Sequence, residues 1–179
     1  MLKKMKIDNY ATFMNPTEID FTATNYKFLE SENVGHNKLL KGCLFVGENA
    51  SGKTKILSSI TFLLELLFAN KEMNFSENKC FFTNKETYKL EYTFIQKNVE
   101  IVYLIEVGTT AIVSEKLIVD KKMILERLGN TAKFLLNEEK TFTNISDKLL
   151  FLRRIYFDTH FYENEVLLDW FDYMVMMLL

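Results

Sequence analysis

Residues 47–54 read GENASGKT, which fits the template of a glycine, any four residues, a second glycine, a lysine and then a serine or threonine. The apolar run at residues 42–46, GCLFV, comes directly before it and predicts a buried strand. A long helical pattern, residues 53–70, follows it without a proline or glycine. A turn between a strand and a helix points backbone N–H groups and the positive helix end at a phosphate. The stretch therefore predicts a phosphate-binding loop.

The residue types of this loop assign roles in binding a nucleoside triphosphate. Gly47 and Gly52 leave room for the backbone to approach the phosphates. Lys53 is predicted to reach the β- and γ-phosphates, and the Thr54 hydroxyl to bind Mg²⁺. The predicted nucleotide-binding residues are Gly47, Glu48, Asn49, Ala50, Ser51, Gly52, Lys53 and Thr54.

Composition and charge place the chain among globular proteins. Its 179 residues suit one domain or one lobe of a larger one, and 48% are apolar. A net charge of −2 indicates no overall bias towards nucleic acid or acidic lipid, although it leaves a local basic patch open. No signal peptide begins the sequence, and the most apolar stretches are too short to span a bilayer. Cys43, expected to be buried, and Cys80 suit a reducing cytoplasm. We therefore expect a cytoplasmic protein with no membrane partner.

The sequence texture changes along the chain. Residues 1–70 hold two short strands (4–9 and 18–21), the loop and the first helix, whose apolar face is wide enough to be covered on several sides. A polar, mobile linker is predicted at 71–87, an antiparallel β-meander at 88–143 and a helical segment at 144–179. Meander strands are expected at 88–95, 100–107, 111–119, 123–127 and 133–136. The last segment is expected to start with Asn144 or Ser146 as N-cap and to contain a strand (155–157) and a helix (163–179).

Three stretches together resemble the RecF/SMC/ABC-type branch of phosphate-loop ATPases. The N-terminal KIDNYATFMNPTEIDF (residues 6–21) is similar to the opening strand pair of that branch, and GENASGKT is similar to its Walker A loop. Residues 92–131, with SEKL and ERLG, resemble the β-meander of a narrower group. That group comprises prokaryotic AAA family ATPases related to OLD and abortive-infection proteins.

The resemblance implies a fold, ligands and a role. The fold is an α/β P-loop NTPase, as the lobe of an ABC-type ATPase, with an antiparallel β-meander. The ligands are ATP and Mg²⁺, the latter held by Thr54, and the setting is phage defence or DNA maintenance. A homodimer or a second polypeptide would complete the ATPase head. Where the branch often has a basic residue after an aromatic in its opening strand, this chain has Ala11 or Thr12.

Two elements of hydrolysis are missing from the sequence. The branch uses an Asp-Glu pair after four apolar residues and a serine-glycine signature, whereas the nearest carboxylates here, Asp158 and Asp169, lack a second acid. Residues 144–179 are therefore predicted to be an incomplete segment, and hydrolysis to need parts that this sequence lacks. Two alternatives stay open: a slow ATPase with an unrecognised carboxylate, and a shortened, non-enzymatic homologue that binds a partner protein.

Other side chains carry weaker signals. Glu115 could face a ligand, but an outward strand carboxylate is the favoured interpretation. Arg153 and Arg154 could contact phosphate or a partner, although basic residues also favour a solvated helix end. His160, like His36, has no metal-ligand spacing, and Trp170 is expected in the core or an interface.

Overall fold

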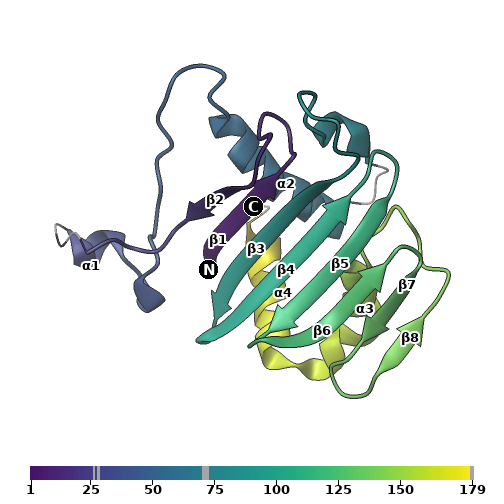
Figure 1. Cartoon of the computed structure of the whole chain (residues 1–179). Coiled ribbons are helices and arrows are strands. Elements are labelled where there is room, and N and C mark those ends of the chain that lie inside the picture. The colour runs from purple at the N-terminus through teal and green to yellow at the C-terminus, as the bar shows by residue number, and fades with distance from the viewer. Residues whose placement is uncertain (26, 28, 70–72, 178–179) are drawn as a thin grey trace.

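The fold is built on one antiparallel β-sheet. The computed structural model describes residues 1–25, 27, 29–69 and 73–177. These residues form an eight-stranded sheet in the order β2-β1-β3-β4-β5-β6-β7-β8, with antiparallel neighbours throughout (Figure 1). The strands are β1 (Leu2–Asp8), β2 (Thr17–Asp20), β3 (Tyr88–Gln96), β4 (Val99–Val107), β5 (Ile112–Val119), β6 (Lys122–Leu128), β7 (Thr131–Phe134) and β8 (Lys140–Phe142).

Tight turns place consecutive strands side by side. Lys97 and Asn98 join β3 to β4, and Asp120 and Lys121 join β5 to β6, each residue with a positive φ. Two-residue turns of this kind match the twist of the strands they join. Gly129, with φ 55°, begins the turn from β6 to β7. Local turn chemistry therefore sets most of the strand order.

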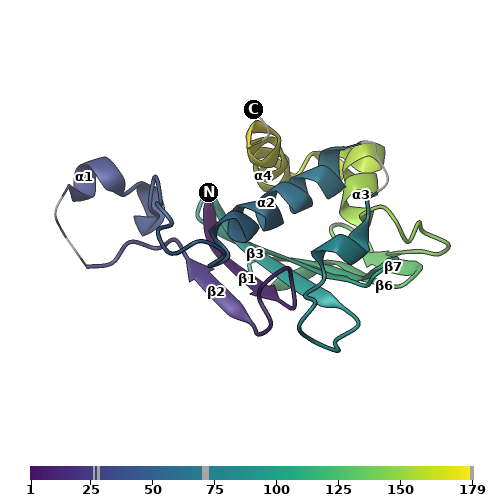
Figure 2. The same ribbon diagram turned by 90° about the horizontal axis from the view of Figure 1, so that it is seen from above.

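The helices that cover the sheet all lie on one of its faces. Figure 2 shows α2 (Lys53–Phe68), α3 (Phe151–Thr159) and α4 (Glu165–Met176) on that side. The short α1 (Glu30–Asn33) stands away from the sheet, beyond β2 (Figure 2). Short 3-10 segments are η1 (His36–Lys38), η2 (Phe75–Asn78) and η3 (His160–Glu163). Within the described residues, no helix combines the length and the apolar character needed to cross a membrane.

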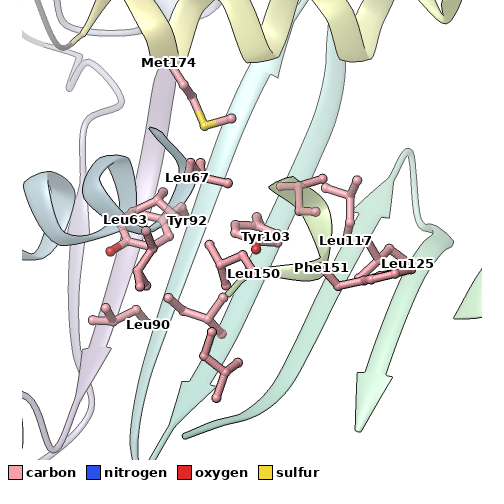
Figure 3. Packing of buried hydrophobic residues seen from close by; sticks show 14 of the residues in the cluster. Leu63, Leu67, Leu90, Tyr92, Tyr103, Leu117, Leu125, Leu150, Phe151 and Met174 are labelled. Carbon is pink, nitrogen blue, oxygen red and sulfur yellow. The ribbon is translucent and has the colours of Figure 1, made fainter. Parts of the chain in front are cut away.

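The core lies between the sheet and these helices. Tyr92, Tyr103, Leu117, Leu125 and Phe134 pair in register across the sheet, and none is more than 1% exposed. Figure 3 shows how the helices face this row, with labelled residues Leu63, Leu67, Phe151 and Met174. Burial of a side chain of this size stabilises a fold by about 1.5–3 kcal/mol. Alternation along the strands thus builds a single core.

This architecture contradicts the α/β P-loop NTPase fold expected from the sequence. Such a fold has a parallel sheet, whereas every strand pair among the described residues is antiparallel. After α2 the chain enters β3, which lies antiparallel to β1 and β4, so α2 is not the crossover of a parallel β-α-β unit. The fold therefore argues against an AAA or ABC-type ATPase, and nothing in the described chain indicates ATP binding through that fold or a defence role.

Several local predictions are nevertheless confirmed. The meander strands and the helix after the 47–54 loop lie where they were expected, although residue 70 is outside the described residues. The predicted strand at 42–46 is wrong, because these residues form no strand and Leu44 is 84% exposed. The predicted strand at 155–157 is also wrong, because it lies inside α3. The second half of helix α2 is covered on several sides, because the consecutive residues Phe62, Leu63 and Leu64 are all buried, whereas its first half is not, with Leu57 55% exposed.

A buried carboxylate joins the sheet to α3. Glu115 on β5 is fully buried, and its Oε1 accepts hydrogen bonds from the Tyr103 hydroxyl (2.8 Å) and from the backbone N–H of Leu152 (2.7 Å). Its Oε2 accepts from the N–H of Phe151 at 2.8 Å. These two amides are at the start of α3, where helix geometry leaves N–H groups without partners. The favoured outward orientation of Glu115 is therefore wrong, as is the predicted N-cap at Asn144 or Ser146.

Arg127 on β6 completes this network. Its NH1 lies 3.6 Å from Glu115 Oε2, and both side chains are fully buried. The guanidinium also donates to the carbonyls of Gly129 (2.9 Å), Leu149 (2.8 Å) and Ser146 (2.7 Å). Burial raises the pKa of Glu115, and the surrounding donors act in the opposite direction. The pair thus fixes both the start of α3 and the loop that leads into it.

We predict that Glu115→Gln lowers the free energy of unfolding by about 3–5 kcal/mol. The change breaks a buried ion pair, and the NH₂ group of the new amide would face backbone N–H donors that cannot accept a hydrogen bond from it. Urea denaturation measures the loss. Glu126→Gln is the matched control, since Glu126 pairs with Lys116 at 3.0 Å between the same two strands but both side chains are over 40% exposed. That control should cost less than about 1 kcal/mol. Similar losses for both variants would contradict the role given to Glu115.

Candidate functional site

The 47–54 loop stands at the N-terminus of α2. Gly52 is the residue before the helix, with φ 92°, and no side chain caps the helix start. The first amide bonded within the helix is that of Ile56, which donates to Gly52 O at 3.1 Å. The earlier amides of the first turn, from Lys53 to Lys55, therefore have no acceptor within the helix. No acidic residue lies in that first turn, so the positive end of the 16-residue helix is not neutralised there.

Lys53 folds back over the loop. Its Nζ donates to the carbonyl oxygens of Gly47 at 2.8 Å and Glu48 at 2.6 Å, and to Ser51 Oγ at 3.2 Å. The Ser51 N–H in turn donates to Glu48 O at 3.3 Å, which tightens the loop. The ammonium is thus held against the loop that leads into the unpaired first amides of α2. The loop and the start of α2 thus bring together an ammonium group and several N–H donors, which is the donor set that a phosphate needs.

Gly52 is buried beneath the connection between β1 and β2. A methyl group on Gly52 would lie 3.0 Å from Phe13 Cζ and 3.2 Å from Thr12 Oγ1. Together with the positive φ, this close approach requires glycine at this position. No pattern in the sequence indicates that Phe13 contacts the loop. Thr12 stood out in the sequence only because the ATPases that the chain resembles often have a basic residue at that place.

The remaining predicted loop residues are accessible. Glu48, Asn49, Ala50, Ser51 and Thr54 are exposed. Thr54 also lines a cavity of about 630 Å³ along the side of α2. Its other lining residues include Lys55, Thr61, Glu65, Asn74 and Asn78. The described residues contain no group of three or more histidine, cysteine or acidic side chains arranged to hold a metal ion.

The other polar candidates make contacts away from the 47–54 loop. Arg153 donates to Leu67 O near the C-terminal end of α2 and lies over the Phe157 ring. Arg154 pairs with Asp158 at 3.2 Å, and Asp169 pairs with Lys97 at 2.6 Å. These contacts give the four charged residues structural partners.

The aromatic and cysteine candidates also have defined positions. The His160 ring packs against Tyr156, with ring centroids 5.4 Å apart, and nothing is described of the His36 side chain. Trp170 is fully buried, which confirms its place in the core. Cys80 is buried, whereas Cys43 is exposed, so the expected burial of Cys43 is wrong.

Comparison with known proteins assigns no family. The sequence matches no protein-family model, and no curated protein matches it.

We predict that Gly52→Ala lowers the free energy of unfolding by about 1–3 kcal/mol, because alanine is strained at this positive φ and its methyl group would press on Phe13. Gly42→Ala is the control, since a methyl group there meets nothing within 4 Å. Its effect should stay below about 1 kcal/mol in either direction. Thermal or urea unfolding of both variants measures the difference, and equal stabilities would contradict the proposed packing of Phe13 on the loop.

Proposed function

We propose that the protein binds a nucleoside triphosphate with Mg²⁺ through the 47–54 loop. The observation that carries this proposal is the position of Lys53, whose ammonium is held by the loop carbonyls beside the free amides of α2. A phosphate group would replace those carbonyls as the partner of the ammonium and would accept hydrogen bonds from the amides. The proposal concerns the loop and α2, and it requires no parallel sheet.

The ligand is argued from the chemistry of the loop. Two lysines, Lys53 and Lys55, lie in the first turn of α2, and the Thr54 hydroxyl is exposed between them. A hydroxyl next to a bound polyphosphate is suited to bind the Mg²⁺ that the phosphates carry. Asp158 and Asp169, the carboxylates considered for hydrolysis, are ion-paired elsewhere. We therefore propose binding and assign no chemical step to the described residues.

We also propose a reducing cytoplasmic setting. Cys43 is exposed and Cys80 is buried, and both thiols are free. An exposed free thiol suits a compartment in which disulfides do not persist.

We predict that Lys53→Ala weakens the binding of Mg²⁺-ATP and Mg²⁺-GTP by about 10- to 100-fold, because a charge-assisted hydrogen bond is worth about 1.5–3 kcal/mol. Isothermal titration calorimetry on the folded protein measures both affinities. Lys55→Ala is the control, because it removes the same charge from the same helical turn without touching the loop carbonyls. It should change the affinity by less than about threefold, the effect of an exposed charge. A folded protein that takes up neither nucleotide would sink the proposal.

Thr54→Ala separates the metal from the phosphates. Because the hydroxyl is assigned to Mg²⁺, this variant should lose the gain in affinity that Mg²⁺ gives while still binding nucleotide in EDTA. Titrations with and without Mg²⁺ measure this gain. Thr61→Ala, on the exposed side of the same helix, is the control and should keep the full Mg²⁺ effect.

A further inference from the structure

The face of the sheet opposite the helices carries a row of charged side chains. Helices α2, α3 and α4 all lie on the other face (Figure 2). Tyr103 and Ile105 on β4 are buried in the core, so Leu104 between them points to the open face. The residues in register with Leu104, from β2 to β7, form the open-face row: Glu18, Lys6, Glu91, Leu104, Lys116, Glu126 and Lys133. Six of these seven line one hollow of about 970 Å³, so they face a shared space.

The signs of the charges in the open-face row reverse about its centre. From β2 towards β4 the side chains are acidic, basic and acidic, and beyond Leu104 they are basic, acidic and basic. Opposite charges on neighbouring strands are common, because like charges directly opposite each other destabilise a sheet. A row that alternated strictly from end to end would, however, carry the same sign at both ends. Here each charge instead has the opposite sign to the one equally far from Leu104 on the other side.

Two charges of the open-face row are unpaired within the described chain. Lys116 and Glu126 form an ion pair at 3.0 Å. Lys6 and Glu91 are also register partners, yet neither has an ion-pair partner among the described residues. Lys6 is exposed and Glu91 is half-buried, so both can be reached from the open face. The row therefore offers an unpaired acid and base on one side of Leu104 and an ion pair on the other.

We propose that the open-face row is the interface of a symmetric dimer, in which a second copy of the chain packs its open face on the first. A twofold axis that runs along β4 through Leu104 reverses the row and turns it towards the other copy. Leu104 then meets Leu104 of the second copy. On either side of this contact, Glu91 meets Lys116 of the second copy, and Lys6 meets Glu126 of the second copy. The reversed order of charges makes every one of these contacts attractive.

The dimer gives partners to the unpaired charges. Lys6 and Glu91 of one copy lie over Glu126 and Lys116 of the other, and the four side chains form a ring of alternating charge. The twofold axis repeats this ring on the other side of Leu104. A network of this kind contributes more than isolated surface ion pairs, which are worth little singly. At the two ends of the row, Glu18 faces Lys133 of the second copy.

The open face has the layout and the size of a specific interface. Val102 and Ile118, register partners that are half-buried, extend the apolar centre around Leu104, and the charges surround it. Glu106 also lies near the axis, but Lys89 balances its charge within its own chain at 3.4 Å. At about 4.8 Å between strands and about 3.3 Å per residue, the strands that carry the row span about 760 Å², close to the roughly 800 Å² that each partner contributes to a stable interface. This contact does not depend on nucleotide binding by the 47–54 loop.

Two single charge reversals test the arrangement, because each variant repels itself and the two attract each other. In a dimer of Lys6→Glu, two acidic side chains face each other at both symmetric contacts, and in a dimer of Glu126→Lys two basic ones do. Each variant alone should dimerise about tenfold or more weakly than the unmodified protein. An equimolar mixture should recover the dimer, because the two new side chains then attract each other and the second contact is the original one. Sedimentation over a micromolar concentration series at low salt measures each sample.

Controls separate this contact from other effects of charge. Lys55→Glu changes the net charge equally but lies on α2, on the other side of the sheet, and should leave dimerisation unchanged. Circular dichroism checks that each variant is folded. Added salt should weaken the dimer, because it screens exposed charges. The urea comparison with Glu126→Gln is made below the dissociation constant of the dimer, where only contacts within one chain count.

Three outcomes would overturn the proposal. One is an unmodified protein that stays monomeric throughout the concentration series. Another is an equimolar mixture that stays monomeric although both variants are folded. The third is equal weakening of the dimer by Lys6→Glu and Lys55→Glu, which would place the contact between copies on another surface.

Discussion

The contact between Glu115 and the start of α3 is the constraint on which the helical layer depends. The carboxylate accepts from two backbone amides of α3 and from Tyr103, and Arg127 balances its charge. A helix end buried without such partners would leave N–H groups unpaired in the core, at a cost of about 1–3 kcal/mol each. The same arginine binds three carbonyls around the loop into α3. One buried pair therefore holds the sheet, the loop and the helix in register.

The parts of the fold that could be predicted from the sequence are the locally determined ones. Turn residues such as Lys97 and Asn98, and the period-two pattern of β3, act within a few positions of each other. The strand expected at 155–157 failed because α3 is stabilised by Glu115, about 40 residues away. The buried strand predicted at 42–46 was wrong because burial of a strand needs neighbours that the described chain does not supply.

The candidate site was also predicted only in part, because a sequence shows signals between neighbouring residues but not contacts between distant ones. The fixed residues of the 47–54 loop were visible in the sequence because they follow one another, whereas the contact of Phe13 with Gly52 joins distant positions. Glu115 was misjudged because a charged strand residue is usually exposed. A signal did exist: Glu115 shares a face with Leu117, and Arg127 shares one with Leu125. Opposite charges at inward positions of adjacent strands indicate a buried pair.

The two sides of the 47–54 loop are held unequally, and this has a thermodynamic consequence. The 47–54 loop is held firmly on the side of α2 and Phe13, but on its other side it continues into the free residues 42–46. A loop anchored at one end loses conformational freedom when it closes on a ligand, and this weakens binding. Any contact that fixes residues 42–46 would remove part of that cost in advance. By linkage, a bound nucleotide would then favour that contact by the same free energy.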